Sequence, residues 1–192
     1  SQVYDLNGDL ETSLKEVEEV TRIQPENFEG HFRKGDIYER LENYKAAVKS
    51  FEEVVSIKPD HTEAHFRLGL NYAKTDRNEG ALSEYKKAVQ IDPNFASAYY
   101  QIGTAFLDLK QYKKALDPLK QAIRIDPDFK EAHYALGKTY NYLNRYQSAI
   151  EPLNQAIRID SQYAFAHLAL GLANTKLKQY DQAVSYLSKA VK

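Results

Sequence analysis

The feature that most constrains this chain is an internal repeat: Pro25 and Pro59 are 34 residues apart, and the same interval recurs along the sequence. Prolines, glycines and alanines each form a column at this spacing. The columns are Pro25, Pro59, Pro93 and Pro127; Gly35, Gly69, Gly103, Gly137 and Gly171; and Ala47, Ala81, Ala115, Ala149 and Ala183. A repeat of this length predicts an array of one supersecondary unit, in which stacked neighbours build a continuous core.

Each repeat contains two apolar stretches of helical length. In residues 62–95 they run over about 62–74 and 79–91, and their apolar residues are mostly three or four positions apart, which is typical of helices. The polar residues 75–78 predict a turn between the two helices. Pro93 is expected to end the second helix, because proline lacks an N–H donor and restricts the residue before it.

The glycine column predicts a close approach of the two helices. A glycine inside a helix costs about 1 kcal/mol relative to alanine, so five of them at one phase imply a compensating benefit. We expect the alanine column of the second helix to face these glycines. Pro118 and Pro152 fall inside second helices, where we expect local bending because each removes one backbone hydrogen bond.

These columns resemble the tetratricopeptide repeat (TPR) family, whose pattern runs aromatic, Leu-Gly, Tyr, Ala, Phe and Pro. One repeat matches it as His65, Leu68, Gly69, Tyr72, Ala81, Tyr85 and Pro93. The resemblance implies an all-α fold, a right-handed superhelical solenoid of antiparallel helix pairs with a concave and a convex surface. The chain departs from the family in its leading position, where histidine or tyrosine replaces tryptophan, and at Asn174 in the tyrosine column.

The resemblance implies about five units behind a partial N-terminal one, together forming one solenoid domain. The expected boundaries are 1–27 for the partial unit, then 28–61, 62–95, 96–129, 130–163 and the C-terminally incomplete 164–192. In the partial unit, Gly8 and Asp9 are expected to form the turn, with Tyr4 in the tyrosine column and Ser13 in the alanine column.

The two ends suggest a longer parent protein. Methionine is absent, including at position 1, and the first residues read as the middle of a helix, so we expect the chain to be part of something longer. At the other end Val184, Leu187 and Val191 have no polar capping helix after them, although solenoid ends normally need one. We therefore expect either a continuation of the parent chain or pairing of the exposed ends.

Composition excludes several classes of protein. The 26 basic and 27 acidic residues give a net charge of -1, which argues against a general nucleic-acid or membrane-surface binder. The chain has no cysteine, which excludes disulfides, thiol nucleophiles and cysteine-ligated zinc. No apolar run approaches the ~18 residues of a transmembrane helix, and the start has no signal-peptide pattern, so we expect a soluble protein and slightly favour the cytoplasm.

The histidines share a column but do not predict a metal site. His31, His65, His133 and His167 lie one or more repeats apart, so they are expected to be about 10 Å or more from each other and cannot share a zinc ion. We expect them to pack between helices. The sequence has no nucleophile motif and no phosphate-binding glycine loop, so we predict no catalytic residue, no cofactor and no metal.

In the family that this chain resembles, the first helix of each unit lines the concave surface, which is the predicted ligand groove. The predicted peptide-binding residues are Phe32, Arg33, Phe66, Arg67, Leu70, Lys74, Tyr100, Thr104, Tyr134, Lys138, Asn141 and Tyr142. Aromatic residues supply a large contact area with little loss of rotamer entropy, although packing explains the same column almost equally well. Basic residues beside aromatics suit an acidic and hydrophobic peptide, or are ordinary solvated charges.

Three ligand classes known from similar folds are not expected. The family members that clamp a chaperone carboxylate use lysines where this chain has Phe32, Phe66 and Tyr100. The asparagine ladder that holds peptide backbone in other members is absent as well. The sequence patterns of helical-repeat proteins that bind RNA fit these columns less well, and the net charge shows no excess of basic residues that RNA binding would need.

The sequence therefore predicts a protein–protein interaction scaffold that binds a peptide or protein segment in the groove, with no nucleic-acid partner and no membrane insertion. Two alternatives remain open at this point. One is a self-assembling structural module that pairs through its uncapped ends or its convex face. The other is the regulatory arm of a larger protein.

Overall fold

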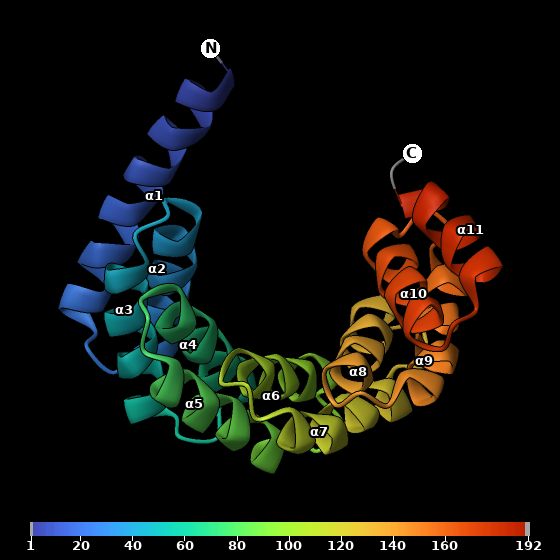
Figure 1. Cartoon of the computed structure of the whole chain (residues 1–192). Helices are drawn as coiled ribbons and strands as arrows, with labels where there is room; N and C mark the ends of the chain where they lie inside the picture. The colour runs from blue at the N-terminus through green and yellow to red at the C-terminus, as the bar shows by residue number, and fades with distance from the viewer. Residues whose placement is uncertain (1, 191–192) are drawn as a thin grey trace. The chain divides into compact units, whose positions relative to one another are not determined.

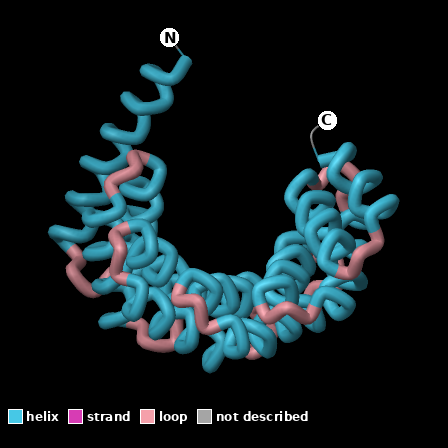
Figure 2. The backbone as a smooth tube through the Cα atoms, in the orientation of Figure 1, coloured by secondary structure: helices cyan, strands magenta, loops and turns pink. Residues whose placement is uncertain are grey.

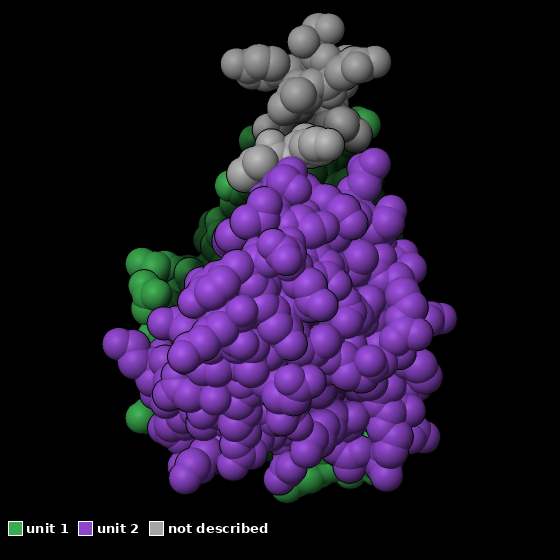
Figure 3. All heavy atoms as spheres, turned by 45° about the vertical axis from the view of Figure 1, so that its right-hand side comes forward, with its two compact units in different colours: residues 1–93 green, residues 94–192 purple. Residues whose placement is uncertain are grey.

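The computed structural model describes residues 2–190, with side chains from Asp9 onward, and every secondary-structure element in this range is a helix. Figures 1 and 2 show helices joined by short loops. The chain divides into two compact units, residues 1–93 and 94–192, which are coloured separately in Figure 3. The all-α prediction is confirmed over the described residues, whereas the single solenoid domain stays a prediction.

Unit 1 consists of two helix pairs preceded by a long helix. Its helices are α1 (Gln2–Ile23), α2 (Phe28–Arg40), α3 (Tyr44–Ile57), α4 (Thr62–Lys74) and α5 (Asn78–Ile91). The pairs are α2 with α3 and α4 with α5, and α1 packs on α2 as α3 packs on α4. Tyrosine hydroxyls tie neighbouring elements together: Tyr38 donates to Glu18 Oε1 at 2.9 Å, and Tyr72 donates to Glu52 Oε1 at 2.6 Å.

Unit 2 consists of three helix pairs. Its helices are α6 (Ala96–Asp108), α7 (Tyr112–Ile125), α8 (Lys130–Tyr142), α9 (Tyr146–Ile159), α10 (Ala164–Lys176) and α11 (Tyr180–Ala190). The first helices of the pairs also contact each other, α6 with α8 and α8 with α10. Pro118 and Pro152 lie inside α7 and α9, which continue through them. The expected bending at these prolines stays an expectation.

The turn within each pair uses one backbone motif. The second residue after each first helix has a left-handed φ: Glu42 (56°), Asp76 (60°), Lys110 (56°), Asn144 (57°) and Lys178 (61°). In the first pair, the N–H of Asn43 donates to the carbonyl of Tyr38 at 2.8 Å, and the N–H of Glu42 donates to that of Glu39 at 2.9 Å. These two bonds satisfy carbonyls that the helix end leaves unpaired, which is the Schellman arrangement.

The histidine column connects four of the first helices, α2, α4, α8 and α10, to the turn before each of them. The Nε2 atoms of His31, His65, His133 and His167 each lie 2.9 Å from the carbonyl oxygen six residues earlier, which belongs to Pro25, Pro59, Pro127 and Ser161. Because a carbonyl only accepts, each Nε2 must carry the proton. The histidines pack against the preceding turn, and the hydrogen bond gives a reason for histidine at four of the five positions of this column, the fifth being Tyr99.

The glycine column does bring the paired helices close together. A Cβ atom added to Gly103 would lie 2.5 Å from Leu119 Cδ2, and one added to Gly69 would lie 2.5 Å from Tyr85 Cε1. The prediction that the alanine column faces the glycines needs correction. The facing residue is the large one four positions after the alanine, because i and i+4 share a helix face and only the larger side chain fills the space over the glycine.

The predicted turn at Gly8 and Asp9 is wrong, because α1 runs unbroken from Gln2 to Ile23. A helical glycine costs only about 1 kcal/mol, and the residues around it favour a helix. Leu10 and Val17 on α1 pack with Ile37 of α2 in a small buried cluster. The side chain of Tyr4 lies outside the described residues, and Ser13 is half-buried in α1.

Candidate binding site

The predicted groove aromatics of unit 1 are half-buried and packed on other rings. Phe32 stacks on His61 with ring centroids 5.2 Å apart and meets Phe51 edge-on at 5.4 Å. Phe66 lies against Tyr85 at 5.9 Å. These contacts account for a packing role, so a ligand would touch only the remaining faces of the rings.

Arg67, a predicted ligand contact in unit 1, is engaged inside the protein. Its Nη2 atom donates to Asp36 Oδ1 at 2.7 Å and also to Glu39 Oε2, and Nη1 lies 3.7 Å from Glu63. The hydrogen bond to Glu39 raises the pKa of Arg67, and this effect outweighs burial. Asp36 and Glu39 belong to the preceding helix pair, so the arginine links two pairs and is already neutralised.

The other predicted residues of unit 1 are spread over the same two helices. Arg33 and Lys74 are exposed and Leu70 is half-buried. The ammonium of Lys74 lies 5.9 Å from the ring centroid of Tyr44, within the range of a cation–π contact.

Unit 2 begins with a similar arrangement on α6. The Tyr100 ring lies 5.0 Å from that of Phe129, and burial raises the pKa of the Tyr100 hydroxyl. The hydroxyl of Thr104 donates to the carbonyl of Gln101 at 3.0 Å. Tyr100 therefore packs as Phe32 does in unit 1.

A pocket between α8 and α10 brings together four of the predicted residues. Tyr134, Lys138, Asn141 and Tyr142 line it from α8, and it encloses about 400 Å³. The remaining lining residues are Tyr146 on α9 and Phe165, Leu168, Ala169, Leu172 and Lys176 on α10. The predicted set of contacts did not include these six, although the groove columns that contain Tyr134, Lys138 and Tyr142 continue to Leu168, Leu172 and Lys176.

The walls of this pocket are apolar and unusually exposed. Tyr142 is 49%, Phe165 61%, Leu168 54% and Leu172 48% exposed. Scattered exposed apolar residues are normal, but a cluster of them within one hollow is typical of a binding site.

The charge in the pocket is positive. The Lys138 ammonium lies 5.9 Å from the Tyr134 ring centroid and 5.7 Å from that of Tyr142, and Lys176 is exposed at the rim. No lining residue is acidic. Lys138 and Lys176 form no ion pair with the described carboxylates, in contrast to Lys130, which lies 2.8 Å from Asp160.

Asn141 is the one uncharged amide in the pocket lining. Its Nδ2 atom donates to the carbonyl of Ala169 at 3.0 Å, which links α8 to α10. Its Oδ1 atom is buried without a hydrogen-bond partner among the described residues. An unpaired buried acceptor is costly, and ligands or water commonly satisfy such groups.

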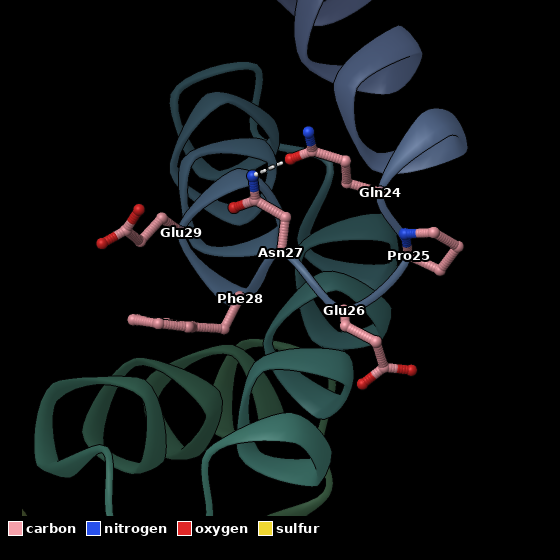
Figure 4. A pocket seen from close by; sticks show the side chains of 6 residues that line it. All are labelled: Gln24, Pro25, Glu26, Asn27, Phe28 and Glu29. Atoms are coloured by element: carbon pink, nitrogen blue, oxygen red, sulfur yellow. Dashed lines mark hydrogen bonds between the residues drawn. The ribbon is translucent and has the colours of Figure 1, made fainter.

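A second hollow lies at the loop between α1 and α2 and encloses about 440 Å³ (Figure 4). The Asn27 side chain there donates to Gln24 at 3.0 Å and accepts from the N–H of Gly30 at 2.8 Å. The labelled carboxylates, Glu26 and Glu29, point away from each other. The polar groups of this loop serve to cap α2, so it is a weaker candidate than the pocket of unit 2.

Two further properties bear on function. Over the part of the chain that the structure describes, no group of three histidine, cysteine or acidic side chains could hold a metal ion. None of the described helices combines the length and the apolar character needed to cross a lipid bilayer.

Sequence models of known repeats match most of the chain. The model described as TPR repeat matches residues 72–110, 103–142 and 137–178, and the one described as Tetratricopeptide repeat matches residues 28–61 and 166–192. A search of curated proteins finds no match to this sequence.

Several solved structures are similar to this chain. The crystal structure of MamA is 29% identical, with a TM-score of 0.78, and the match covers 82% of this chain and 92% of that one. A MamA structure from Desulfovibrio magneticus is 22% identical, with a TM-score of 0.80 and coverage of 85% and 93%. YrrB, described as a TPR protein with an unusual peptide-binding site, is 17% identical, with a TM-score of 0.79 and coverage of 91% and 90%.

Proposed function

Because the chain belongs to the tetratricopeptide repeat family, a family of generally non-enzymatic interaction scaffolds, we propose that it binds a peptide or protein segment through its first helices. The pocket between α8 and α10 is the centre of this site. The predicted contacts on α2 and α4 in unit 1, and those on α6 in unit 2, are each proposed as ligand contacts in their own right but contribute less, because most of them are half-buried or already paired.

One observation carries the proposal: four large apolar side chains of α8 and α10 are about half exposed around a single pocket. Leaving this area in water is unfavourable by about 25 cal/mol per Å² of apolar surface, and a bound segment would remove it from water. YrrB offers a parallel in its described peptide-binding site, but the argument rests on the surface of this chain.

The test compares partners captured from an extract of the source cells. We expect a partner held by the unchanged chain and lost from the Phe165→Ser, Leu172→Ser double variant, whose two positions are exposed and tolerate a polar residue. The matched control is Val20→Ser, Ile23→Ser, which removes two exposed apolar residues from α1, outside the pocket. Loss of the partner in the control and not in the pocket variant would contradict the proposed site.

A second candidate function is self-association through α11. Tyr180 is 60% and Val184 67% exposed, and Leu187 is 37% exposed on the same helix. Val191, the fourth residue in this argument, lies outside the described residues. Sedimentation velocity over a range of concentrations tests the idea: a mass that stays that of one chain throughout would contradict it.

A further inference from the structure

The exposed face of α10 is mostly apolar, and its exposed polar residues, Thr175 and Lys176, lie in its last turn. Its inner face buries Ala166, Leu170 and Ala173 completely. The opposite face presents Phe165, Leu168 and Leu172 to water. Large apolar side chains gathered on an exposed helix face are typical of a contact surface.

The charge beside this apolar face shows what kind of segment fits it. Lys138 and Lys176 stand on the two helices that flank the pocket, and no described carboxylate pairs with either of them. Arg67 of unit 1 differs, since it is held by Asp36 and Glu39. A carboxylate brought in by a ligand would find unpaired ammonium groups in a partly desolvated site, where charge pairs are stronger than in open water.

The aromatic rings that hold Lys138 also limit its freedom. Its ammonium lies within 6 Å of the rings of Tyr134 and Tyr142, so the charge is held over the pocket. The side-chain amide of Asn141, which donates to the carbonyl of Ala169 at 3.0 Å, connects the two helices that line the pocket.

We propose that this pocket selects an acidic peptide segment, in which a large apolar side chain fills the space between α8 and α10 and neighbouring carboxylates pair with Lys138 and Lys176. This inference rests on the proposed function and names the chemistry of its ligand. Nucleic acid also combines negative charge with flat rings, but Leu168, Leu172 and Phe165 give the site an aliphatic and hydrophobic wall, and the net charge of the chain is -1.

The test is selection from a random peptide library with the full chain as bait. We expect the selected peptides to contain leucine or an aromatic residue close to aspartate or glutamate. A labelled synthetic copy of a selected peptide should bind about tenfold more weakly to the Lys138→Glu, Lys176→Glu variant, and its affinity should fall as salt is added. Lys113→Glu, Lys120→Glu changes the charge equally on exposed positions of α7 and should leave affinity unchanged.

A peptide of reversed charge provides the decisive comparison. A peptide with its acidic residues replaced by lysine should bind the Lys138→Glu, Lys176→Glu variant better than it binds the unchanged chain. If peptides are selected but are basic, or bind both charge variants equally well, the inference is wrong while peptide binding stands. If no peptide is selected, the proposed function fails together with the inference. Tight binding of labelled oligothymidine that the peptide cannot displace would overturn the choice of a peptide ligand.

Discussion

At the glycines of the repeat column, the absence of a Cβ atom allows the paired helices to approach each other closely. Each column glycine lies opposite a large side chain, and several of these side chains are fully buried, such as Phe51, Leu119 and Leu153. Interiors packed to this density respond to the addition of one methyl group. The glycines are therefore steric requirements at helical positions, where alanine would otherwise be favoured by about 1 kcal/mol.

Gly103→Ala should destabilise the protein. The new Cβ would lie 2.5 Å from Cδ2 and 2.6 Å from Cγ of Leu119, and the branched Cγ cannot move without shifting α7. Overpacking costs about 1–3 kcal/mol and the higher helix propensity of alanine offsets about 1, so we expect a net loss of up to about 2 kcal/mol in unfolding free energy. Urea denaturation measures this. Gly80→Ala is the control, because its Cβ would come no closer than 3.0 Å to Tyr72, and equal effects at both sites would contradict the steric account.

Lys110→Gly should stabilise the protein, because Lys110 holds a left-handed φ of 56° that costs a residue with a Cβ about 1–2 kcal/mol. Glycine also increases the backbone entropy of the unfolded chain, which offsets part of this stabilisation. We therefore expect the unfolding free energy to rise by about 0.5–1 kcal/mol. Chemical denaturation is the measurement. The same change at Lys113, inside α7, should instead lose about 1 kcal/mol. A loss at Lys110 as well would argue against the turn geometry.

The buried pair of His65 and Glu84 should make stability depend on pH. His65 Nδ1 lies 2.6 Å from Glu84 Oε2, while Nε2 donates to the Pro59 carbonyl, so both ring nitrogens face acceptors. Burial opposes ionisation of Glu84, but hydrogen bonds from His65 and Lys87 outweigh it and hold the pKa of Glu84 below its ordinary value. The stabilisation is therefore present above the unfolded-state pKa and lost as the pH falls through the lower folded-state pKa.

We expect Glu84→Gln to lower the unfolding free energy at pH 7 by about 2 kcal/mol, the contribution of a hydrogen bond to a charged group. The difference from the unchanged protein should shrink as the pH falls below the ordinary glutamate pKa and vanish below the lower folded-state pKa, where Glu84 is protonated in both states. Denaturation curves at several pH values test this, with the exposed Glu79→Gln as control. A difference that does not change with pH would contradict the assignment.

At the scale of the helices, local chemistry made most boundaries predictable from the sequence. The helices expected at residues 62–74 and 79–91 are observed as Thr62–Lys74 and Asn78–Ile91. These boundaries are predictable because turn residues and prolines end a helix through their own backbone conformation and hydrogen bonding, which do not depend on distant contacts. The α1 helix was missed because Gly8 and Asp9 resemble a turn, whereas the neighbouring residues sustain the helix. The residues that contact the glycines were not predicted correctly. The repeat columns show which positions share a helix face, but they do not show which side chain on that face is long enough to contact the paired helix.

Pro118→Ala tests the energetic cost of a proline inside α7. The proline cannot donate to the carbonyl of Lys114, and an interior proline is about 3 kcal/mol less favourable than alanine. We expect the variant to be more stable and its amide hydrogens in α7 to exchange more slowly, as measured by mass spectrometry. Pro127→Ala, in the loop after α7, should instead be neutral or slightly destabilising. Unchanged exchange in α7 would mean that the helix absorbs the proline without cost.

At the scale of the whole chain, the candidate site was predictable only in part. The columns on α8 identified Tyr134, Lys138, Asn141 and Tyr142, because the family pattern fixes which helix face they occupy. The pairing of Arg67 with Asp36 and Glu39 joins residues 31 and 28 positions apart and depends on side-chain conformations that the repeat pattern does not encode. On α10, Phe165 was not predicted because its column had no groove residue assigned to it, whereas Leu168 already stood in the column of Tyr134.

The central claim is that partner binding is centred on the pocket between α8 and α10. The most direct measurement is site-specific photocrosslinking in an extract of the source cells, with photoreactive benzoylphenylalanine in place of Leu168 in one chain and of Lys120, on α7, in another. We predict that a partner is crosslinked from position 168 and not from position 120, and that an excess of the selected acidic peptide prevents the reaction. Crosslinking from position 120 alone, or from neither position while the partner still binds, would contradict the claim.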